Sequence, residues 1–296
     1  MFDSKRWFSR AKLHPPAYLL AVTLICGCTS SPEVSAVRTP PPVAEGVVAV
    51  TPEVEESPPP IHVTLIQLND IYEITPVSGG RWGGPARVAT VRKRLTEANP
   101  NTYTILAGDL FSPSALGTAR VDGERLAGRQ MVAVLNEMGL DYATFGNHEF
   151  DLNEAQFLSR MDESAFEWVS TNVTDDEGAL FPHTEKHEIL TVRDPSGRAL
   201  RIGFIGLCYD GINPDYVDFL DPIQTARDEV EVLRDRVDAI VAITHLPVGQ
   251  DISLAQAIPE LDLIIGGHEH ENMRLFRGPV LTPILKADAN VRTLYI

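Results

Sequence analysis

Residues 141–151 read DYATFGNHEFD, a short apolar run that ends in a glycine and a cluster of polar side chains. The apolar part predicts a buried β-strand over 141–145. The same combination recurs after four more predicted strands. Strands over 63–68, 103–107, 239–243 and 261–265 are followed by Asn69-Asp70, Gly108-Asp109, Thr244-His245 and Gly266-Gly267-His268-Glu269-His270. Because ligands of open α/β sheets lie beyond the carboxyl ends of the strands, we expect these side chains to converge on one site.

Helical patterns alternate with these strands. A predicted helix over 85–98 begins with a proline, which helices tolerate in their first turn. A second, over 124–138, ends before Gly139, a residue typical of helix C-termini. Further along the chain, a strand over 202–206 precedes an amphipathic helix over 223–237, and 291–296 is again strand-like. The alternation predicts an α/β domain that occupies residues 61–296.

The charge of the chain limits its partners. The 296 residues carry a formal net charge of −16, and the basic residues Lys5, Arg6, Arg10 and Lys12 near the start have no comparable cluster in the predicted domain. An acidic surface repels polyanions, so we expect no nucleic-acid duplex as a partner. A small phosphate ester remains compatible, because bound divalent cations would supply local positive charge.

The first 60 residues predict export and anchoring. A basic start and an apolar stretch over 17–25 have the layout of a secretory signal. The signal ends in Ile25-Cys26-Gly27-Cys28, which resembles a bacterial lipobox with Cys28 as the lipidated residue; an ordinary signal peptide cleaved nearby is the alternative. Residues 1–28 are therefore expected to be a lipoprotein signal peptide and 29–60 a proline-rich linker. Thr29 after the cysteine favours the outer membrane, facing the periplasm or the cell surface.

The polar cluster has the composition of a metal site. Asp, Asn and His without Cys provide oxygen and nitrogen ligands, which suit Mn, Zn, Fe, Co or Ni. Two adjacent cations need a bridging carboxylate, and such a pair activates water and clamps the oxygens of an in-line phosphoryl displacement. A neighbouring histidine can protonate the leaving oxygen. We therefore expect two divalent or mixed-valence metal ions as cofactors.

The order of these motifs resembles that of the calcineurin-like metallophosphoesterases. Gly146-Asn147-His148-Glu149-Phe150-Asp151 and Gly83-Gly84-Pro85-Ala86-Arg87 are most similar to the bacterial 5′-nucleotidase branch, which includes cyclic-nucleotide phosphodiesterases. The resemblance implies a four-layer α/β/β/α sandwich of two mixed sheets. It implies a first metal held by Asp70, Asp109 and His270, and a second held by Asp109, Asn147, His245 and His268. It also implies that His148 is catalytic and that Asp151 orients it. Asp151 has an alternative role, which is to cap a helix that begins near Leu152.

The chain departs from the family pattern twice. The first motif of the family is Asp-x-His, and here it reads Asp70-Ile71-Tyr72. Tyr72 is expected either to ligate the first metal as a phenolate, which favours a trivalent ion such as Fe(III), or only to pack there; a catalytically inert protein is the third reading. The second departure is the C-terminal nucleotide-binding domain of typical 5′-nucleotidases, which is expected to be absent. The chain is then either a fragment or a one-domain variant.

Together these patterns predict metal-dependent hydrolysis of phosphate monoesters outside the cytoplasm, with nucleoside 5′-phosphates as the expected substrates. Two alternatives remain open at this point. One is a cyclic-nucleotide or general phosphodiesterase. The other is an inactive, metal-binding surface lipoprotein, which would follow if Tyr72 prevented the binding of two metals.

Overall fold

The computed structural model describes residues 58–296. The predicted signal peptide, Cys28 and the linker as far as residue 57 lie outside the described residues. Within 58–296, none of the helices combines the length and the apolar composition that a bilayer-spanning segment needs.

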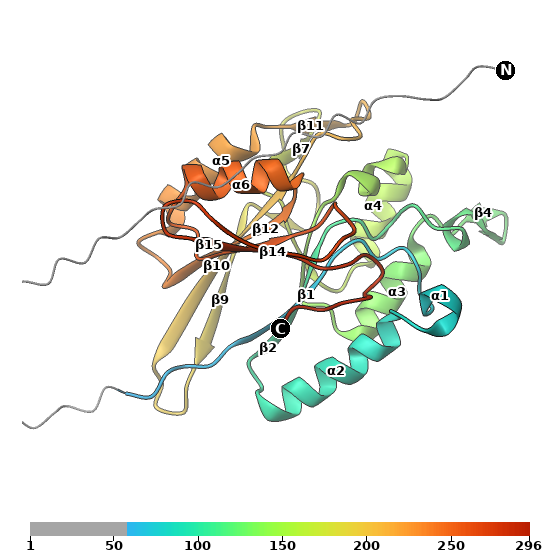
Figure 1. The fold of residues 1–296 in the computed structure, drawn as a ribbon. Coiled ribbons are helices and arrows are strands. Elements are labelled where there is room, and N and C mark those ends of the chain that lie inside the picture. Colours follow the sequence, from blue (N-terminus) through green and yellow to red (C-terminus); the bar gives the residue numbers. More distant parts are fainter. Residues whose placement is uncertain (1–57) are drawn as a thin grey trace, which may run out of the picture. The chain divides into compact units, whose positions relative to one another are not determined.

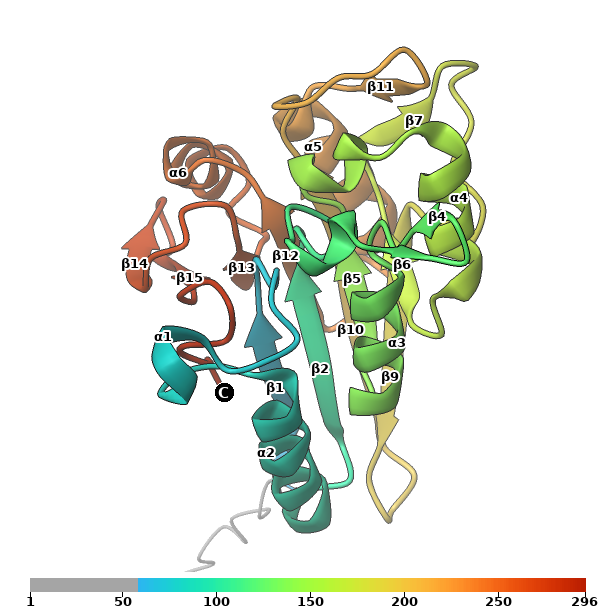
Figure 2. The same ribbon diagram turned by 90° about the vertical axis from the view of Figure 1, so that its right-hand side faces the viewer.

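A five-stranded sheet carries the first half of the predicted site. Its order is β1 (Thr64–Leu68), β2 (Thr102–Ala107), β5 (Tyr142–Thr144), β6 (Glu167–Val169) and β8 (Thr184–Glu185). All neighbouring strands in it are parallel, so the expectation that both sheets are mixed is wrong for this one. The carboxyl ends of β1, β2 and β5 therefore lie at the same edge, as the arrowheads of β1 and β2 show in Figure 2.

A six-stranded sheet carries the second half. Its order is β14 (Met273–Arg277), β15 (Thr282–Lys286), β13 (Leu263–Gly266), β12 (Ala239–His245), β10 (Ala199–Cys208) and β9 (His187–Arg193). The four central strands are parallel, and both edge strands are antiparallel to their neighbours, so this sheet is mixed. The strand expected over 291–296 is wrong. That segment forms turns and contributes only an isolated antiparallel bridge between Tyr295 and Gln67.

The three predicted helices are present, but two have other bounds, and the one expected over 223–237 already ends at Leu233. The helices of residues 58–296 are α1 (Val77–Gly80), α2 (Pro85–Ala98), α3 (Arg129–Met138), α4 (Glu154–Glu163), α5 (Pro222–Leu233) and α6 (Val248–Ala257). The helix expected over 124–138 starts only at Arg129. Residues 124 and 125 instead form β4 (Glu124–Arg125), which pairs with β3 (Arg120–Val121). Ala127 and Gly128 have φ values of 42° and 87°, outside the helical region, and this prevents the helix from starting earlier.

The shorter elements complete the chain. They are the 3₁₀ turns η1 (Leu116–Thr118) and η2 (Asn147–Asp151) and a two-stranded sheet of β7 (Val173–Asp175) and β11 (Val217–Phe219).

Three hydrophobic clusters establish the layers. One lies between the two sheets and joins residues such as Ile105 of β2 to Phe204 of β10 and Ile243 of β12. A second packs the five-stranded sheet against α2, α3 and α4, and a third packs the six-stranded sheet against α5 and α6. In Figure 1 the helices accordingly lie on opposite sides of the paired sheets. The predicted four-layer α/β/β/α arrangement is confirmed, and Cys208 is buried, as expected of a small apolar side chain.

Candidate metal centre

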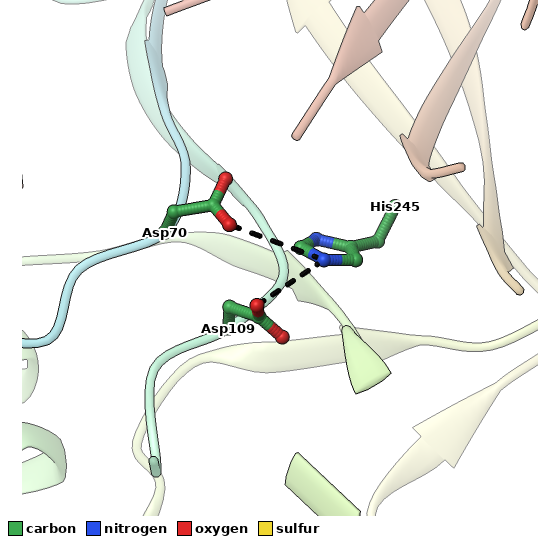
Figure 3. A group of neighbouring side chains, drawn as sticks. All are labelled: Asp70, Asp109 and His245. Carbon is green, nitrogen blue, oxygen red and sulfur yellow. Dashed lines mark ion pairs between the residues drawn. The ribbon is translucent and has the colours of Figure 1, made fainter. Parts of the chain in front are cut away.

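The loops after the strands bring the predicted ligands together, as the sequence indicates. Asp70 follows β1, Asp109 follows β2 and His245 ends β12, and their ligand atoms all lie within 4.8 Å of one another. The Nε2 atom of His245 is 3.3 Å from Oδ2 of Asp109 and 4.0 Å from Oδ1 of Asp70 (Figure 3). His270, after β13, places its Nε2 atom 3.0 Å from Oδ1 of Asp70. The two sheets therefore contribute to one centre.

Two further predicted ligands border the same centre. His268 donates its backbone N–H to Oδ2 of Asp70 at 2.9 Å, and the centroid of its ring lies 5.4 Å from that of His245. Asn147 is buried at the start of η2. The residue after it, His148, donates its backbone N–H to Oδ1 of Asp109 at 2.9 Å. Backbone hydrogen bonds thus fix both loops against the aspartates.

Glycines allow the loops to approach this closely. A Cβ atom on Gly146 would lie 2.2 Å from Oδ1 of Asp109, and one on Gly108 would lie 2.5 Å from Nδ1 of His245. Asp70 and Asp109 themselves adopt φ values of 52° and 62°, a region that costs non-glycine residues energy. The glycines therefore permit the close approach of the loops, and the backbone strain lies at the functional residues.

The last described residues close the site from the other side. The side chain of Asn69 accepts the N–H of Ala287 at 2.9 Å and donates to its carbonyl oxygen at 3.0 Å. The carbonyl oxygen of Asp70 accepts the N–H of Asn290 at 2.8 Å. Asn69 also donates to Oδ2 of Asp70. The loop that carries Asp70 is therefore held by residues that follow β15.

The two buried carboxylates of the centre require a positive counter-charge. Asp70 and Asp109 are 0% and 1% exposed. Burial alone would raise the pKa of Asp70, but His245, His270 and the Asn69 hydrogen bond together lower it well below its usual range. Burial also lowers the pKa of His245, and the Asp109 and Asp70 carboxylates outweigh this effect and raise it to about 10. In the absence of a metal, the imidazole would have to supply the positive charge that these two carboxylates require.

Two buried atoms without partners match a metal site. Nδ1 of His245 donates to the carbonyl oxygen of Ala107 at 2.8 Å, which leaves Nε2 as the free ligand atom. Within residues 58–296, neither this Nε2 atom nor Oδ1 of Asn147 has a hydrogen-bond partner, although both are buried. Buried polar atoms are normally paired. Since both atoms are expected ligands of the second metal, the residues fit a bound ion.

The predicted catalytic pair is formed beside this centre. Nδ1 of His148 lies 2.9 Å from Oδ2 of Asp151, which also accepts a 2.7 Å hydrogen bond from the Ser112 hydroxyl. The helix-capping role considered for Asp151 is wrong. The following helix, α4, starts later, and the side chain of Asn153 caps it by accepting the N–H of Gln156 at 3.0 Å. Asp151 is thus free to orient the histidine.

Tyr72 lies inside the centre. It is 9% exposed, and its hydroxyl oxygen is 2.8 Å from Oδ2 of Asp109, 2.9 Å from Nε2 of His270 and 3.1 Å from Oδ1 of Asp70. Burial and the charges of Asp70 and Asp109 raise the pKa of its phenol far above the usual range. The residue that departs from the family motif therefore contacts all three expected ligands of the first metal.

Sequence reasoning assigned no role to Glu149, which supports the site. Its buried carboxylate accepts the backbone N–H groups of Asp109, Leu110, Phe111 and Gly146. Burial and the Asp109 charge raise the pKa of Glu149 to about 7. The carboxylate thereby joins the loops after β2 and β5. Its position inside the Gly-Asn-His-Glu motif was the signal that could have identified it.

Sequence reasoning also missed Lys286, which is fully buried in β15. Its ammonium donates to the carbonyl oxygens of Leu246 and Gly267 at 2.6 and 2.7 Å. It also forms ion pairs with Asp251, at 2.7 Å, and Glu269. Leu246 follows His245 and Gly267 precedes His268, so one side chain ties together the two loops that carry expected ligands of the second metal. A lone lysine in an apolar strand was the available signal.

The chain is similar in sequence to several known proteins. An apyrase from Tabanus yao is 30% identical over 225 residues, which cover 70% of this chain and 39% of the relative. An NAD 5′-nucleotidase from Haemophilus influenzae is 24% identical over 228 residues, which cover 74% of this chain and 36% of the relative. The chain thus spans less than two fifths of the length of either relative.

The fold also has counterparts among solved structures. The calcineurin-like phosphoesterase YfkN from Bacillus subtilis superimposes with a TM-score of 0.65 at 21% identity, over 80% of this chain and 84% of that one. The sequence profile of the calcineurin-like phosphoesterase family matches residues 63–272, which include all six expected metal ligands. The chain belongs to the calcineurin-like phosphoesterase family.

Proposed function

We propose that the protein hydrolyses phosphate monoesters with the help of two metal ions, and that nucleoside 5′-phosphates are its substrates. The observation that carries the proposal is the buried group of Asp70, Asp109 and His245, in which the Nε2 atom of His245 has no hydrogen-bond partner. The names of the two relatives, an apyrase and an NAD 5′-nucleotidase, support nucleotides as the substrate class.

The ligands divide between two positions that share Asp109. Asp70, Asp109 and His270 would hold the first ion. Asp109, Asn147, His245 and His268 would hold the second. Bound metal ions supply Lewis-acid stabilisation of the phosphoryl oxygens and lower the pKa of water at neutral pH. Asp109 is the only member of both proposed sets, so it would hold both ions.

His148 is the proposed donor to the leaving oxygen. Asp151 accepts from Nδ1 at 2.9 Å, which fixes the tautomer and orientation of the ring and leaves Nε2 for the substrate. The backbone N–H of His148 is bonded to Asp109, so the ring is held at a fixed place relative to the bridge. Proton transfer by a residue positioned in this way contributes about 10²–10⁴-fold to rate.

A cavity beside this pair can hold the leaving group. It has a volume of about 420 Å³ and is lined in part by Ser112, Asp151, Leu152 and Gln156. Ligand cavities of small molecules typically have about 300–1,000 Å³. Asp151 and its partner Ser112 line this cavity, so a group bound in it would lie beside the residue that orients the proposed proton donor.

We also propose that the protein is exported and anchored in the outer membrane through a lipid on Cys28. The support is the sequence of residues 1–28, with its basic start, apolar stretch and lipobox-like end. Mass spectrometry of the N-terminal peptide tests this, because lipidation adds the mass of acyl chains to Cys28. A Cys28→Ala variant should lose that mass and leave the membrane fraction.

The hydrolytic proposal is tested on the purified full chain with AMP and with bis(p-nitrophenyl) phosphate. Phosphate and nitrophenol release are measured with added Mn²⁺ and after treatment with EDTA. We expect metal-dependent phosphate release from AMP, and a loss of turnover with retained metal in His148→Ala. His183→Ala is the matched control, because His183 is exposed and contacts Asp162 instead of the centre.

The other outcomes identify the alternatives. Cleavage of the diester alone would show that the protein is a phosphodiesterase and would overturn the proposal. Activity on neither ester with two metals bound would favour a binding protein.

Asp109→Ala should lose both metals by elemental analysis, and retention of both would refute its assignment as the bridge.

A further inference from the structure

We propose that the leaving group of the substrate carries a second phosphate and that the side chains of Arg120 and Arg125 bind it. The inference rests on the proposed function and deepens it, because it adds a chemical feature of the substrate. Its starting point is a second cavity, of about 810 Å³, which lies between the β3–β4 hairpin and α4. Arg125, Asp151 and Gln156 line both this cavity and the one of about 420 Å³ described above, so the two cavities adjoin.

Positive charge gathers in the second cavity, although the chain is acidic. The lining contains four arginines and three acidic residues, whereas the whole chain has a formal net charge of −16. The arginines are Arg120, Arg125, Arg129 and Arg160. A cleft lined by an excess of one charge raises the local concentration of ions of the opposite sign. The second cavity therefore favours an anion.

The acidic residues of this cavity neutralise only two of the four arginines. Oε1 of Glu163 lies 3.2 Å from Nε of Arg129 and 2.6 Å from Nη2 of Arg160. Asp151 is already bonded to two side chains of the proposed catalytic site. The third acidic residue, Glu124, belongs to β4 and forms no ion pair with any residue of 58–296. Two positive charges therefore remain.

These two charges belong to Arg120 and Arg125, which have no acidic partner among residues 58–296. The two arginines lie directly opposite each other in the β3–β4 ladder, and the neighbouring cross-strand pair is Val121 with Glu124. Because successive residues of a strand point to opposite faces, both arginines belong to one face of the hairpin and Glu124 to the other. Like charges directly opposite each other destabilise a strand pair. An anion bound between the two guanidinium groups would remove this repulsion.

A phosphate group matches this pair of guanidinium groups in shape and in charge. Each guanidinium presents a planar fork of donors that binds two phosphate oxygens at once. A phosphate monoester carries about −1.5 to −2 charges at neutral pH, so one such group can neutralise both arginines. A carboxylate, with a single charge, would leave one of them uncompensated.

The residues that flank the two arginines are fixed to the body of the domain. The buried side chain of Arg160 donates from Nη1 to the carbonyl oxygens of Leu126 and Ala127 at 3.0 and 3.2 Å. The N–H of Leu126 donates to the carbonyl oxygen of Ala119 at 2.9 Å, which closes the base of the hairpin. Figure 1 shows the hairpin beside α4, the helix that contains Arg160. The two guanidinium groups are therefore carried on a positioned support.

The order of the two cavities indicates which part of the substrate carries this phosphate. The first cavity adjoins Asp151, which orients the proposed proton donor His148, and it also reaches Arg125. A group that leaves beside His148 would therefore extend through the first cavity toward the hairpin. A nucleoside with phosphates on its 5′ and 3′ oxygens has this arrangement, with the 5′ phosphate at the metal ions and the 3′ phosphate at the arginines.

The experiment compares two esters on the purified full chain with added Mn²⁺. AMP and adenosine 3′,5′-bisphosphate differ only in the 3′ phosphate, and chromatography of the products shows which phosphate is released. We expect release of the 5′ phosphate from both esters. The kcat/KM for the bisphosphate should be about tenfold higher, through a lower KM, because hydrogen bonds to charged groups contribute about that factor. Calorimetric titration with adenosine 3′-phosphate, which has no 5′ phosphate, measures the affinity of the anion site separately.

Variants of the two arginines test their role. The double variant Arg120→Gln, Arg125→Gln should bring the ratio of kcat/KM for the two esters close to one. It should also weaken the binding of adenosine 3′-phosphate about tenfold. The double variant Arg120→Lys, Arg125→Lys keeps both charges and should retain part of the preference, which separates the loss of charge from misfolding.

Arg193→Gln is the matched control and should keep the wild-type ratio. Arg193 donates to the carbonyl oxygen of Gly197 at 3.3 Å across a hairpin turn, as Arg120 does to that of Gly123 at 2.6 Å. Its hairpin joins β9 to the amino end of β10, whereas the site lies beyond the carboxyl ends of the strands.

The outcomes separate this inference from the proposed function. Equal kcat/KM values for the two esters in the wild type would overturn it, as would a preference that survives in the double glutamine variant. Release of the 3′ phosphate alone would also overturn it, because the substrate would then be bound in the opposite direction. A chain that hydrolyses neither ester but binds adenosine 3′-phosphate through the two arginines would reject the hydrolytic function and uphold the anion site.

Discussion

Replacing Lys286 with methionine removes the charge that joins the two loops of the second metal position while keeping most of the side-chain volume. The ammonium of Lys286 is fully buried and contacts Asp251, Glu269 and the carbonyl oxygens of Leu246 and Gly267. Methionine fills the space but donates no hydrogen bond. Asp251 and Glu269 then face each other in the interior without a counter-charge.

The expected cost in stability follows from that burial. Removing one partner of a buried ion pair costs about 3–5 kcal/mol, because the other charge remains uncompensated. For a domain of 150–250 residues, each kcal/mol lowers Tm by about 2–4 °C. The Lys286→Met variant should therefore melt about 6–20 °C below the wild type. The loss should be smaller at low pH, because burial raises the pKa of Asp251 and its protonated carboxyl group needs no counter-charge.

The assay compares melting with metal binding. The triple variant Lys286→Met, Asp251→Asn, Glu269→Gln neutralises the whole cluster and should recover most of the lost stability, since a neutral cluster has no unpaired charge. It does not restore the link between the Leu246 and Gly267 carbonyl groups. We therefore expect the second metal to remain weakly bound, by about 10–100-fold, as is typical when an outer-shell partner is lost.

Two results would refute this reasoning. If Lys286→Met bound both metals with wild-type affinity, the lysine would not position His245 and His268. If the triple variant recovered metal affinity together with Tm, the lysine would act only by neutralising charge.

Three further variants or treatments test other parts of the structure. Chelation should lower Tm by several degrees, because Asp70 and Asp109 are buried together and would lose their counter-charge. Added Mn²⁺ should restore the Tm. An unchanged melting curve would exclude a stabilising metal. Asp151→Asn should lower kcat about 10–100-fold without changing metal content, because the orientation of His148 is lost; unchanged kcat would remove Asp151 from the mechanism. Phe157→Ala should lower the free energy of unfolding by about 3–5 kcal/mol in a denaturant titration. The reason is that Phe157 is fully buried among aromatic rings. A loss of less than about 1 kcal/mol would contradict that packing.

The parts of the fold that sequence predicts well are those with strong local patterns. The buried strands that end in Leu68, Ala107 and His245 were recognisable because a continuous apolar run stops abruptly at polar residues. The segment before α3 was mispredicted for the opposite reason. Its residues favour a helix, and the backbone at Ala127 and Gly128 is determined by tertiary packing; a Cβ atom on Gly128 would lie 3.0 Å from Phe111. Local propensity carries no information about such a contact.

The same distinction applies to the site. Asp70, Asp109 and His245 were predictable because sheet topology alone brings the ends of parallel strands together. Lys286 was not, since its partners are 17 (Glu269) to 40 (Leu246) residues away and none of them forms a local pattern with it. The role of Asp151 was likewise ambiguous from the sequence, because an aspartate shortly before a helix can either cap that helix or orient a nearby histidine. Only the later start of α4 decides between them.

The contacts of Asn69 and Asp70 with residues 287–290 have a consequence for when the ions are acquired. More than 200 residues of chain separate the two sides of these contacts, and Lys286 enters the structure equally late. A growing polypeptide lacks these contacts until residues 286–290 have been synthesised and folded back. A chain that crosses a membrane unfolded would therefore take its metals from the compartment in which it folds, and the supply of ions there, rather than in the cytoplasm, would determine which metals it carries.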